Sequence, residues 1–355
     1  MSIPQRVQDV RRLLQAAVSQ SRNSNVNPQQ VRRLPVQMGN TSIEERYLRD
    51  FYVEEWEMVT DDDASTSQCY LPFRVVKPVK DPPDEKKKYP VVMFLHPTGG
   101  DRNYHIVWES RYVSRGYMTV SVDSRYHGRR QDSQLPYQHA LVKAYSEQDC
   151  GEKPFLLDNV WDQQRILDVL ETRDDVDMRR IGVTGMSLGG MHSWLLAACD
   201  ERIACACPIC GVQYFRYALE NDCYYERVMS IPDVFRYATE TSSSKKEGPF
   251  PLSVTKETVQ RVWDRLLPDM LEHYDADVSL GAIAPRPFLI VTGCKDARNP
   301  IKGIEMVYEK AQRVYEALGA KDMIRLFAQQ DAGHECTAHM MQQVDSWMDK
   351  HLLLL

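Results

Sequence analysis

Residues 183–190 read V-T-G-M-S-L-G-G, and this stretch decides how the whole chain is interpreted. It contains the pattern G-x-S-x-G centred on Ser187, directly after an apolar run of strand length and before a helical pattern. A serine on such a sharp strand-to-helix turn has its hydroxyl exposed at the edge of a sheet. Larger residues two positions away on either side would collide with the neighbouring strand and helix. The stretch therefore predicts a nucleophilic serine.

Strand-length apolar runs alternate with helical patterns on both sides of this turn. Continuous β-branched and apolar runs are typical of parallel strands that are covered on both faces. The expected strands are 51–58, 69–76, 91–95, 118–122, 181–184, 203–207, 288–291 and 323–327, and helical spacing is clearest at 160–170, 191–198, 304–318 and 340–351. This order predicts an α/β fold with a doubly wound, mostly parallel sheet, whose ligand site lies at the carboxyl ends of the strands.

Two segments lie outside this alternation. Residues 1–50 begin with helical spacing of apolar side chains from Val7 to about Ser19, which predicts an N-terminal helical extension. The main domain is expected at 51–355, with a cap inserted at about 212–284. The cap is inferred because roughly eighty residues separate two strands there, far more than an ordinary connection needs.

The composition is that of an ordinary globular protein. The 355 residues are 43% hydrophobic and 26% charged, with a formal net charge of −6. A mildly acidic surface repels phosphate backbones, so we expect no nucleic-acid partner. No run approaches the roughly 18 consecutive apolar residues that a spanning helix needs, so we expect no membrane span. Assembly into a homo-oligomer is left open.

The nine cysteines are scattered through the expected strands and helices rather than framing short loops. This favours a reducing compartment, and the cytoplasm is the expected location. The alternative is an organelle, because the N-terminus is Arg-rich and acid-poor like a transit segment. Cys207 and Cys210 have the C-x-x-C spacing of some zinc sites, but their run is apolar and no second pair lies near. We expect neither metal nor organic cofactor.

A serine hydroxyl is a weak nucleophile until a base removes its proton. His334 is the best-placed of the nine histidines, because it lies in a loop just after the strand 323–327 and just before the last helix. His192 is nearer in sequence, but its helical position predicts packing in the core. We therefore expect His334 to be the general base.

The histidine needs an acid that orients the imidazole and stabilises its charged form. Asp296 follows the strand 288–291 in a turn, one strand before His334. Asp331 is the main rival, but it lies only three residues before the histidine in the same loop. The chain order Ser187, Asp296, His334 is the one expected for this kind of sheet.

The tetrahedral intermediate also needs N–H donors for its oxyanion. The backbone N–H of Leu188, directly after the nucleophile, is the first expected donor. The second should come from the loop H-P-T-G-G-D after the strand 91–95, where we expect the N–H of Thr98, with that of Gly99 as the alternative.

The segments H-P-T-G-G, D-S-R-Y-H-G-R-R, G-M-S-L-G-G, G-C-K-D and G-H-E-C-T occur in this order. Together they resemble the α/β-hydrolase superfamily, most of all its dienelactone hydrolase, acetyl xylan esterase and prolyl-oligopeptidase-like esterase branches. The resemblance covers about Tyr89 to Leu353, except for Gly211 to Ala284. Carried over position by position, it implies the triad and the oxyanion donors named above.

Two positions depart from the family. His-Gly is common where this chain has His96 and Pro97, and dienelactone hydrolases proper use a cysteine nucleophile. The serine favours hydrolysis of a small-molecule carboxylic ester through an acyl-enzyme. The alternatives are a peptidase, thioesterase or acyltransferase with the same triad, and a member of the fold that only binds a small ligand.

Overall fold

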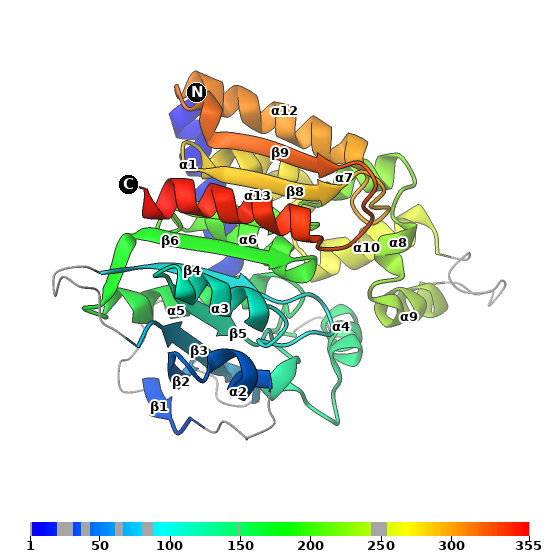
Figure 1. The fold of residues 1–355 in the computed structure, drawn as a ribbon. Coiled ribbons are helices and arrows are strands. Elements are labelled where there is room, and N and C mark those ends of the chain that lie inside the picture. Colours follow the sequence, from blue (N-terminus) through cyan, green and yellow to red (C-terminus); the bar gives the residue numbers. More distant parts are fainter. Residues whose placement is uncertain are drawn as a thin grey trace.

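The computed structural model describes residues 2–19, 31–36, 43–60, 67–79, 88–147, 150–242 and 254–354. A nine-stranded sheet forms its centre, in the order β1-β2-β3-β5-β4-β6-β7-β8-β9 (Figure 1). The strands are β1 Val31–Leu34, β2 Tyr52–Val59, β3 Tyr70–Lys77, β4 Tyr89–Leu95, β5 Met118–Val122, β6 Val176–Met186, β7 Cys205–Ile209, β8 Phe288–Gly293 and β9 Ile324–Gln329. From β5 through β4, β6, β7 and β8 to β9, neighbouring strands are parallel. Strands β1, β2 and β3 pair antiparallel at one side of the sheet, and β3 is also antiparallel to β5.

The predicted α/β class and mostly parallel sheet are confirmed, and each of the eight expected strands is present within a few residues of its expected bounds. Strand β1 was not expected. Its sequence, V-R-R-L, has no apolar run, and it is held by backbone pairing with residues 55–58 of β2. The expected helical extension over residues 1–50 thus also contains a strand, and the division of the chain into extension, main domain and cap stays a prediction.

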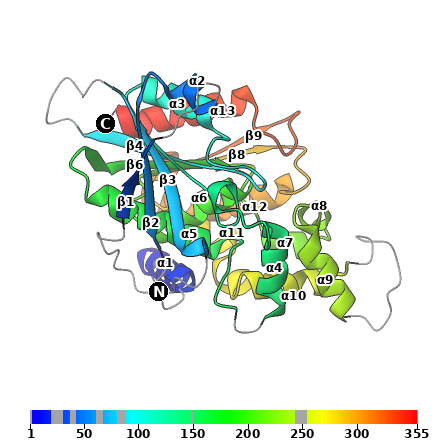
Figure 2. The same ribbon diagram turned by 90° about the horizontal axis from the view of Figure 1, so that it is seen from below.

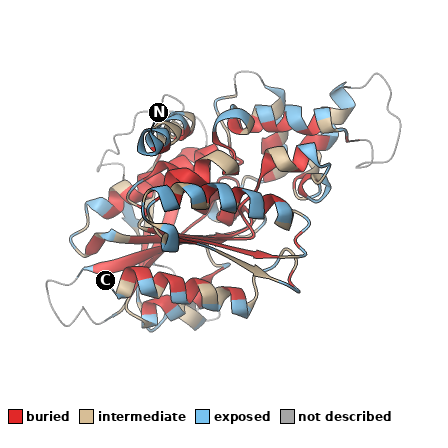
Figure 3. Ribbon diagram, turned by 90° about the horizontal axis from the view of Figure 1, so that it is seen from above, coloured by how far each residue is buried: buried red, intermediate tan, exposed pale blue. Residues whose placement is uncertain are grey.

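Helices cover both faces of the sheet (Figures 2 and 3). One face carries α1 Ile3–Ser19, α5 Leu157–Glu171, α6 Leu188–Cys199 and α12 Ile301–Ala317, and the other carries α3 Ile106–Ser114 and α13 Ala338–Met348, which continues as the π-helical turn η7 Asp349–Leu353. All twelve residues of α6 are buried. A helix that is apolar on every side belongs in the centre of a core, so the element that follows Ser187 is firmly fixed.

A further helical layer lies beyond the carboxyl ends of the central strands (Figures 1 and 2). The connection from β7 to β8 supplies α7 Phe215–Glu220, α8 Tyr225–Val228, α9 Pro232–Ser242, α10 Lys256–Leu266, η4 Met270–Tyr274, α11 Ala276–Ser279 and η5 Leu280–Ile283. Helix α4, Tyr137–Ser146, packs against α9 and α10, although it belongs to the connection that follows β5. Two separate connections therefore build this layer, and the expected cap accounts for only one of them.

The remaining short elements are α2 Ile43–Leu48 and the 3-10 turns η2 Ser67–Cys69, η3 Gly128–Arg130 and η6 Lys321–Met323. None of the helices in the described part of the chain combines the length and the apolar character needed to span a bilayer.

Buried charges fix the loop that follows β5. The carboxylate of Asp162, on α5, accepts hydrogen bonds from Arg125 at 3.1 Å and from Arg130 at 2.7 Å, and all three side chains are buried. Burial alone would raise the pKa of Asp162, but the two guanidinium groups outweigh it and hold the pKa below its ordinary value. The loop is therefore tied to a core helix.

We expect Asp162→Asn to lower the free energy of unfolding by about 3–5 kcal/mol, because it removes the buried carboxylate that Arg130 and Arg125 share. Arg125 keeps its ion pair with Asp158 at 3.3 Å. Since the folded pKa of Asp162 is lowered, its stabilisation is complete well above the unfolded value of about 4 and is lost as the pH falls below it. Urea denaturation at several pH values measures both effects. Asp233→Asn, which breaks the exposed pair with Arg236, is the matched control and should cost less than about 1 kcal/mol. Equal losses in the two variants would show that Asp162 does not stabilise the fold through its buried ion pairs.

Candidate active site

Ser187 stands between β6 and α6 in a strained conformation. Its backbone has φ 54 and ψ −112, a region that residues with a side chain rarely adopt. Two backbone hydrogen bonds stabilise this conformation. The Ser187 N–H donates to the carbonyl of Ile209 at 2.9 Å, and the Ser187 carbonyl accepts from the N–H of Met191 at 2.8 Å. The turn expected from the sequence is thus present.

The spacing of the glycines follows from the contact between this turn and the end of β4. A Cβ atom at Gly189 would lie 2.1 Å from the carbonyl oxygen of Leu95, and one at Gly185 would lie 2.5 Å from the same oxygen. Real Cβ atoms do not approach backbone this closely, so both positions require glycine.

Three distant segments of chain meet at this turn. The Oγ of Ser187 lies 2.8 Å from Nε2 of His334, and Nδ1 of His334 lies 2.8 Å from Oδ2 of Asp296. An ionised carboxylate only accepts hydrogen bonds, so Nδ1 carries the proton and Nε2 accepts from the serine hydroxyl. The structure therefore brings together all three residues of the triad predicted from the sequence.

Asp296 is held by its own turn. Its Oδ1 accepts from the backbone N–H groups of Arg298 at 2.9 Å and Asn299 at 3.2 Å, while the side-chain amide of Asn299 donates to Oδ2 at 2.9 Å. Burial alone would raise the pKa of Asp296, but the hydrogen bonds from His334, Asn299 and Arg298 outweigh it, so the pKa lies below its ordinary value. The acid is kept ionised.

The rival residues lie elsewhere. Asp331 is at the surface, where it pairs with Lys295 at 3.2 Å. His192 is fully buried within α6, and its Nε2 lies 3.2 Å from the carbonyl of Phe155, to which it donates. Each side chain is engaged with the partner just named, and neither hydrogen-bonds to Ser187 or His334.

Cys210 lies beside the triad. Its sulfur, a carboxylate oxygen of Asp296 and a ring nitrogen of His334 lie within 4.8 Å of one another. The thiol donates to the carbonyl of Glu335 at 3.3 Å, and burial together with the charge of Asp296 raises its pKa to about 12. Asp296 and His334 are engaged in the hydrogen bonds of the triad, so this cluster fits a hydrogen-bonded relay.

The two expected oxyanion donors lie at the ends of adjacent strands. Leu188 is the first residue of α6, so its N–H has no acceptor within the helix. Thr98 follows β4 in a turn that is closed by the Gly100 N–H on the Pro97 carbonyl at 3.0 Å, with φ 77 at Gly99. The Thr98 N–H takes no part in the hydrogen bond of its own turn.

The imidazole of His96 stabilises the turn at Thr98 through two contacts. Its Nδ1 lies 2.8 Å from the Pro97 carbonyl, and its Nε2 accepts from the backbone N–H of Ser124 at 2.9 Å. Burial lowers the pKa of His96 more than the Pro97 contact and two nearby aspartates raise it, so the ring is neutral and can accept at Nε2. The departure from His-Gly to His96 and Pro97 thus retains a fixed backbone next to Thr98.

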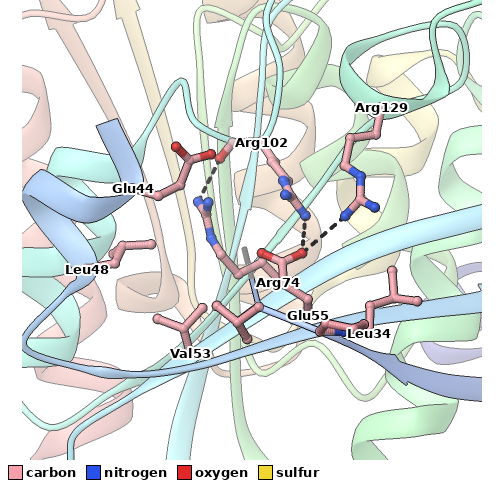
Figure 4. A pocket seen from close by; sticks show the side chains of 10 residues that line it. Leu34, Glu44, Leu48, Val53, Glu55, Arg74, Arg102 and Arg129 are labelled. Atoms are coloured by element: carbon pink, nitrogen blue, oxygen red, sulfur yellow. Dashed lines mark hydrogen bonds and ion pairs between the residues drawn. The ribbon is translucent and has the colours of Figure 1, made fainter. Parts of the chain in front are cut away.

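A cavity of about 330 Å³ lies apart from the triad, near β1, β2 and α2 (Figure 4). It is lined by Leu34, Pro35, Val36, Glu44, Leu48, Val53, Glu55, Arg74, Arg102 and Arg129. Arg102 and Arg129 both bond to Glu55, at 2.5 and 3.4 Å, so much of their charge is compensated. None of the predicted site residues lines this cavity.

Solved structures share this fold. The methylesterase BT1017 superposes with a TM-score of 0.65 and 15% identity over 98% of this chain and 64% of its own length. Acetyl xylan esterase 1 from Thermoanaerobacterium sp. JW/SL YS485 gives 0.63 and 16% over 99% of this chain and 98% of its own. In sequence, YtaP of Bacillus subtilis, described as a hydrolase, is 25% identical over 276 residues, which are 74% of this chain and 79% of that protein.

The fold is the α/β-hydrolase fold of these neighbours, and the matching family model identifies an esterase-type hydrolase, as the motifs in the sequence predicted. The model of the family described as fungal glucuronyl esterase matches residues 75–319, which is more than half of the chain. The chain belongs to this family.

Sequence reasoning did not identify Asn299. The signal was present, since an aspartate that accepts from the backbone N–H groups two and three residues later is a common turn motif, and G-C-K-D-A-R-N-P has the required spacing. The second role of Asn299, as an amide donor to Oδ2 of Asp296, has no such local signature.

The contact at Gly189 yields a test of the turn. We expect Gly189→Ala to lower the free energy of unfolding by about 3 kcal/mol or more, because the new methyl group collides with the backbone of β4. Gly151→Ala is the matched control, since a Cβ there meets nothing within 4 Å, and its effect should stay within about 1 kcal/mol. Thermal unfolding followed by circular dichroism compares the two variants. An unchanged melting temperature for Gly189→Ala would show that α6 and β4 are farther apart.

Proposed function

We propose that this protein hydrolyses a carboxylic ester through an acyl-enzyme formed on Ser187. The observation that carries the proposal is the continuous hydrogen-bonded series from Ser187 Oγ through His334 to Asp296, with both distances at 2.8 Å. That arrangement supplies a nucleophile, a base within reach of its proton, and an acid that fixes the base.

In the first half-reaction, Ser187 Oγ attacks the ester carbonyl while His334 Nε2 takes the hydroxyl proton. The carbonyl oxygen becomes an oxyanion, for which the N–H groups of Leu188 and Thr98, or Gly99 in place of Thr98, are the proposed donors. The bond to the alcohol oxygen then breaks, and the imidazolium gives its proton to the departing alkoxide. Asp296 stabilises the imidazolium through Nδ1.

In the second half-reaction, water attacks the acyl group and passes a proton to His334 Nε2. The bond between the acyl carbon and Ser187 Oγ breaks, and the proton returns to the serine. The products are a carboxylic acid and the free enzyme. These steps require neither a metal ion nor an organic cofactor.

We propose that the ester belongs to a carbohydrate. The support is the family, whose name is that of glucuronyl esterases, together with the fold neighbours that are named as a methylesterase and as acetyl xylan esterases. The helical layer formed by α4 and by residues of about 212–284 would then act as a cap that selects the alcohol or acyl group.

We also propose a reducing compartment, with the cytoplasm as the first candidate. All nine cysteines are free thiols in the structure, and five of them are buried within strands, helices or the loops next to them. This pattern supports the expectation from the sequence.

Ser187→Ala should lower kcat for ester hydrolysis by at least about 10³-fold, because the variant cannot form the acyl-enzyme. It should also abolish covalent labelling by a fluorophosphonate. Ser193→Ala is the matched control, since Ser193 lies on the same helix but its hydroxyl donates to the Gly189 carbonyl. Wild-type hydrolysis rates in Ser187→Ala would refute the proposed mechanism.

A substrate panel tests the proposed class. For each ester, kcat/KM is divided by the rate constant of the uncatalysed hydrolysis. We expect this ratio to be higher for methyl glucuronate or acetylated xylose than for p-nitrophenyl acetate, because a cap that binds a sugar contributes transition-state stabilisation. Matched amide and thioester substrates in the same assay separate an esterase from a peptidase or a thioesterase. A preference for the amide would favour the peptidase alternative.

A further inference from the structure

Arg227 is a buried cation close to the triad. The residue is 2% exposed and lies in α8, within the connection that builds the helical layer. Its Nη2 donates to Oδ1 of Asn299 at 2.7 Å, and Nε and Nη2 both donate to Oε1 of Gln213, at 3.1 and 2.8 Å. Within the described part of the chain, no carboxylate forms an ion pair with it. Its partners are the side-chain oxygens of Asn299 and Gln213 and, at 3.5 Å from Nη2, the backbone carbonyl of Arg298.

These contacts leave the Asn299 amide only one orientation. A guanidinium can only donate and an ionised carboxylate can only accept, so the oxygen of Asn299 must face Arg227 and its nitrogen must face Asp296. The nitrogen accordingly donates to Asp296 Oδ2 at 2.9 Å and to the Cys210 carbonyl at 2.8 Å. Oδ2 is the oxygen that also accepts from His334.

We propose that Arg227 is a positioning residue for the triad, which fixes Asn299 and through it the carboxylate of Asp296 that orients His334. This inference rests on the proposed function. It assigns a role to a residue of the inserted connection that touches none of the three triad side chains by hydrogen bond.

The free-energy cost of burying the Arg227 guanidinium supports a specific role for this residue. A buried charge without a paired counter-charge is unfavourable, and an apolar side chain at this position would avoid that cost. Burial lowers the pKa of Arg227 to about 10, against the opposing effect of Asp296, so the group is charged at neutral pH. Asp296 is therefore the anion that stabilises the charged form of Arg227. The side-chain amide of Asn299 lies between the two groups and hydrogen-bonds to both.

The charge also acts on the base. A cation beyond Asp296 disfavours a second cation on His334, so its removal should make protonation of the imidazole easier. Arg298 and Cys210 also act on Arg227, and Cys336 acts on Cys210. None of these three groups changes in the variants below. The acid-side midpoint of the pH–activity profile should therefore move to higher pH when Arg227 is neutralised.

The test compares Arg227→Met, Arg227→Lys and the control Arg286→Met in the full chain. Arg286 is matched because burial also lowers its pKa to about 10, and because it donates to the backbone carbonyls of Ala197, Asp200 and Ile203, none of which hydrogen-bonds to a triad side chain. Rates for p-nitrophenyl acetate are divided by the concentration of sites that react with fluorophosphonate, so unfolded protein does not count.

We expect Arg227→Met to lower kcat about tenfold with little change in KM, and to raise the acid-side midpoint by about half a pH unit. Arg227→Lys keeps the charge and should restore the midpoint more fully than it restores kcat. Arg286→Met should lower the melting temperature and leave both kinetic measures unchanged.

The proposal is overturned if Arg227→Met matches wild type in kcat and midpoint, or changes only the melting temperature as the control does. Should Arg227→Met fail to fold, Asn299→Ala cuts the same series of contacts from the other side and must show the same loss of kcat. Ser187→Ala, run alongside with its rate given per total folded protein because it has no site for the fluorophosphonate, separates the two hypotheses. If it is inactive while Arg227→Met behaves as wild type, the triad mechanism stands and only the positioning role falls.

Discussion

The backbone of α6 touches the backbone of β4 with no side chain between them, and the rest of the site depends on this contact. It places the start of a fully buried helix directly against the end of a central strand, and Ser187 is the residue that must make the bend. The strained φ of that residue is stable because the elements on both sides are packed in the core. The proposed nucleophile is therefore held in position by the close packing of α6 against β4.

The carboxylate of Asp296 is the second point on which the site depends. It accepts hydrogen bonds from its own turn, from an amide and from an imidazole, and so it joins the loops that follow β8 and β9. Through Asn299 it is also linked to the carbonyl of Cys210, at the end of β7. The ends of three adjacent strands are therefore tied by one buried anion, which explains how residues far apart in sequence can keep hydrogen-bond distances.

Much of this arrangement could be predicted from the sequence, because its signals are local. The G-x-S-x-G pattern between a strand and a helix identified Ser187, and the rule that parallel strands end at one edge then selected Asp296 and His334. Strand β1 escaped prediction because V-R-R-L has no hydrophobic pattern and is held by backbone pairing with β2 and by polar contacts such as the ion pair of Arg32 with Glu57. Helix α4 could not be assigned to the helical layer, since its partners α9 and α10 lie in another connection. Arg227 and Asn299 met only in the folded chain, where a buried polar contact between distant segments leaves no periodic trace.

The construction of the helical layer from two connections bears on how such proteins can be altered. A chimaera that replaces residues of about 212–284 with the corresponding segment of a relative would exchange more than a lining for ligands. It would also remove Gln213 and Arg227, and α9 and α10 would no longer offer their original surfaces to α4. Grafting a new specificity onto this scaffold therefore means carrying the connection that follows β5 and the amide at position 299 together with the transplanted segment.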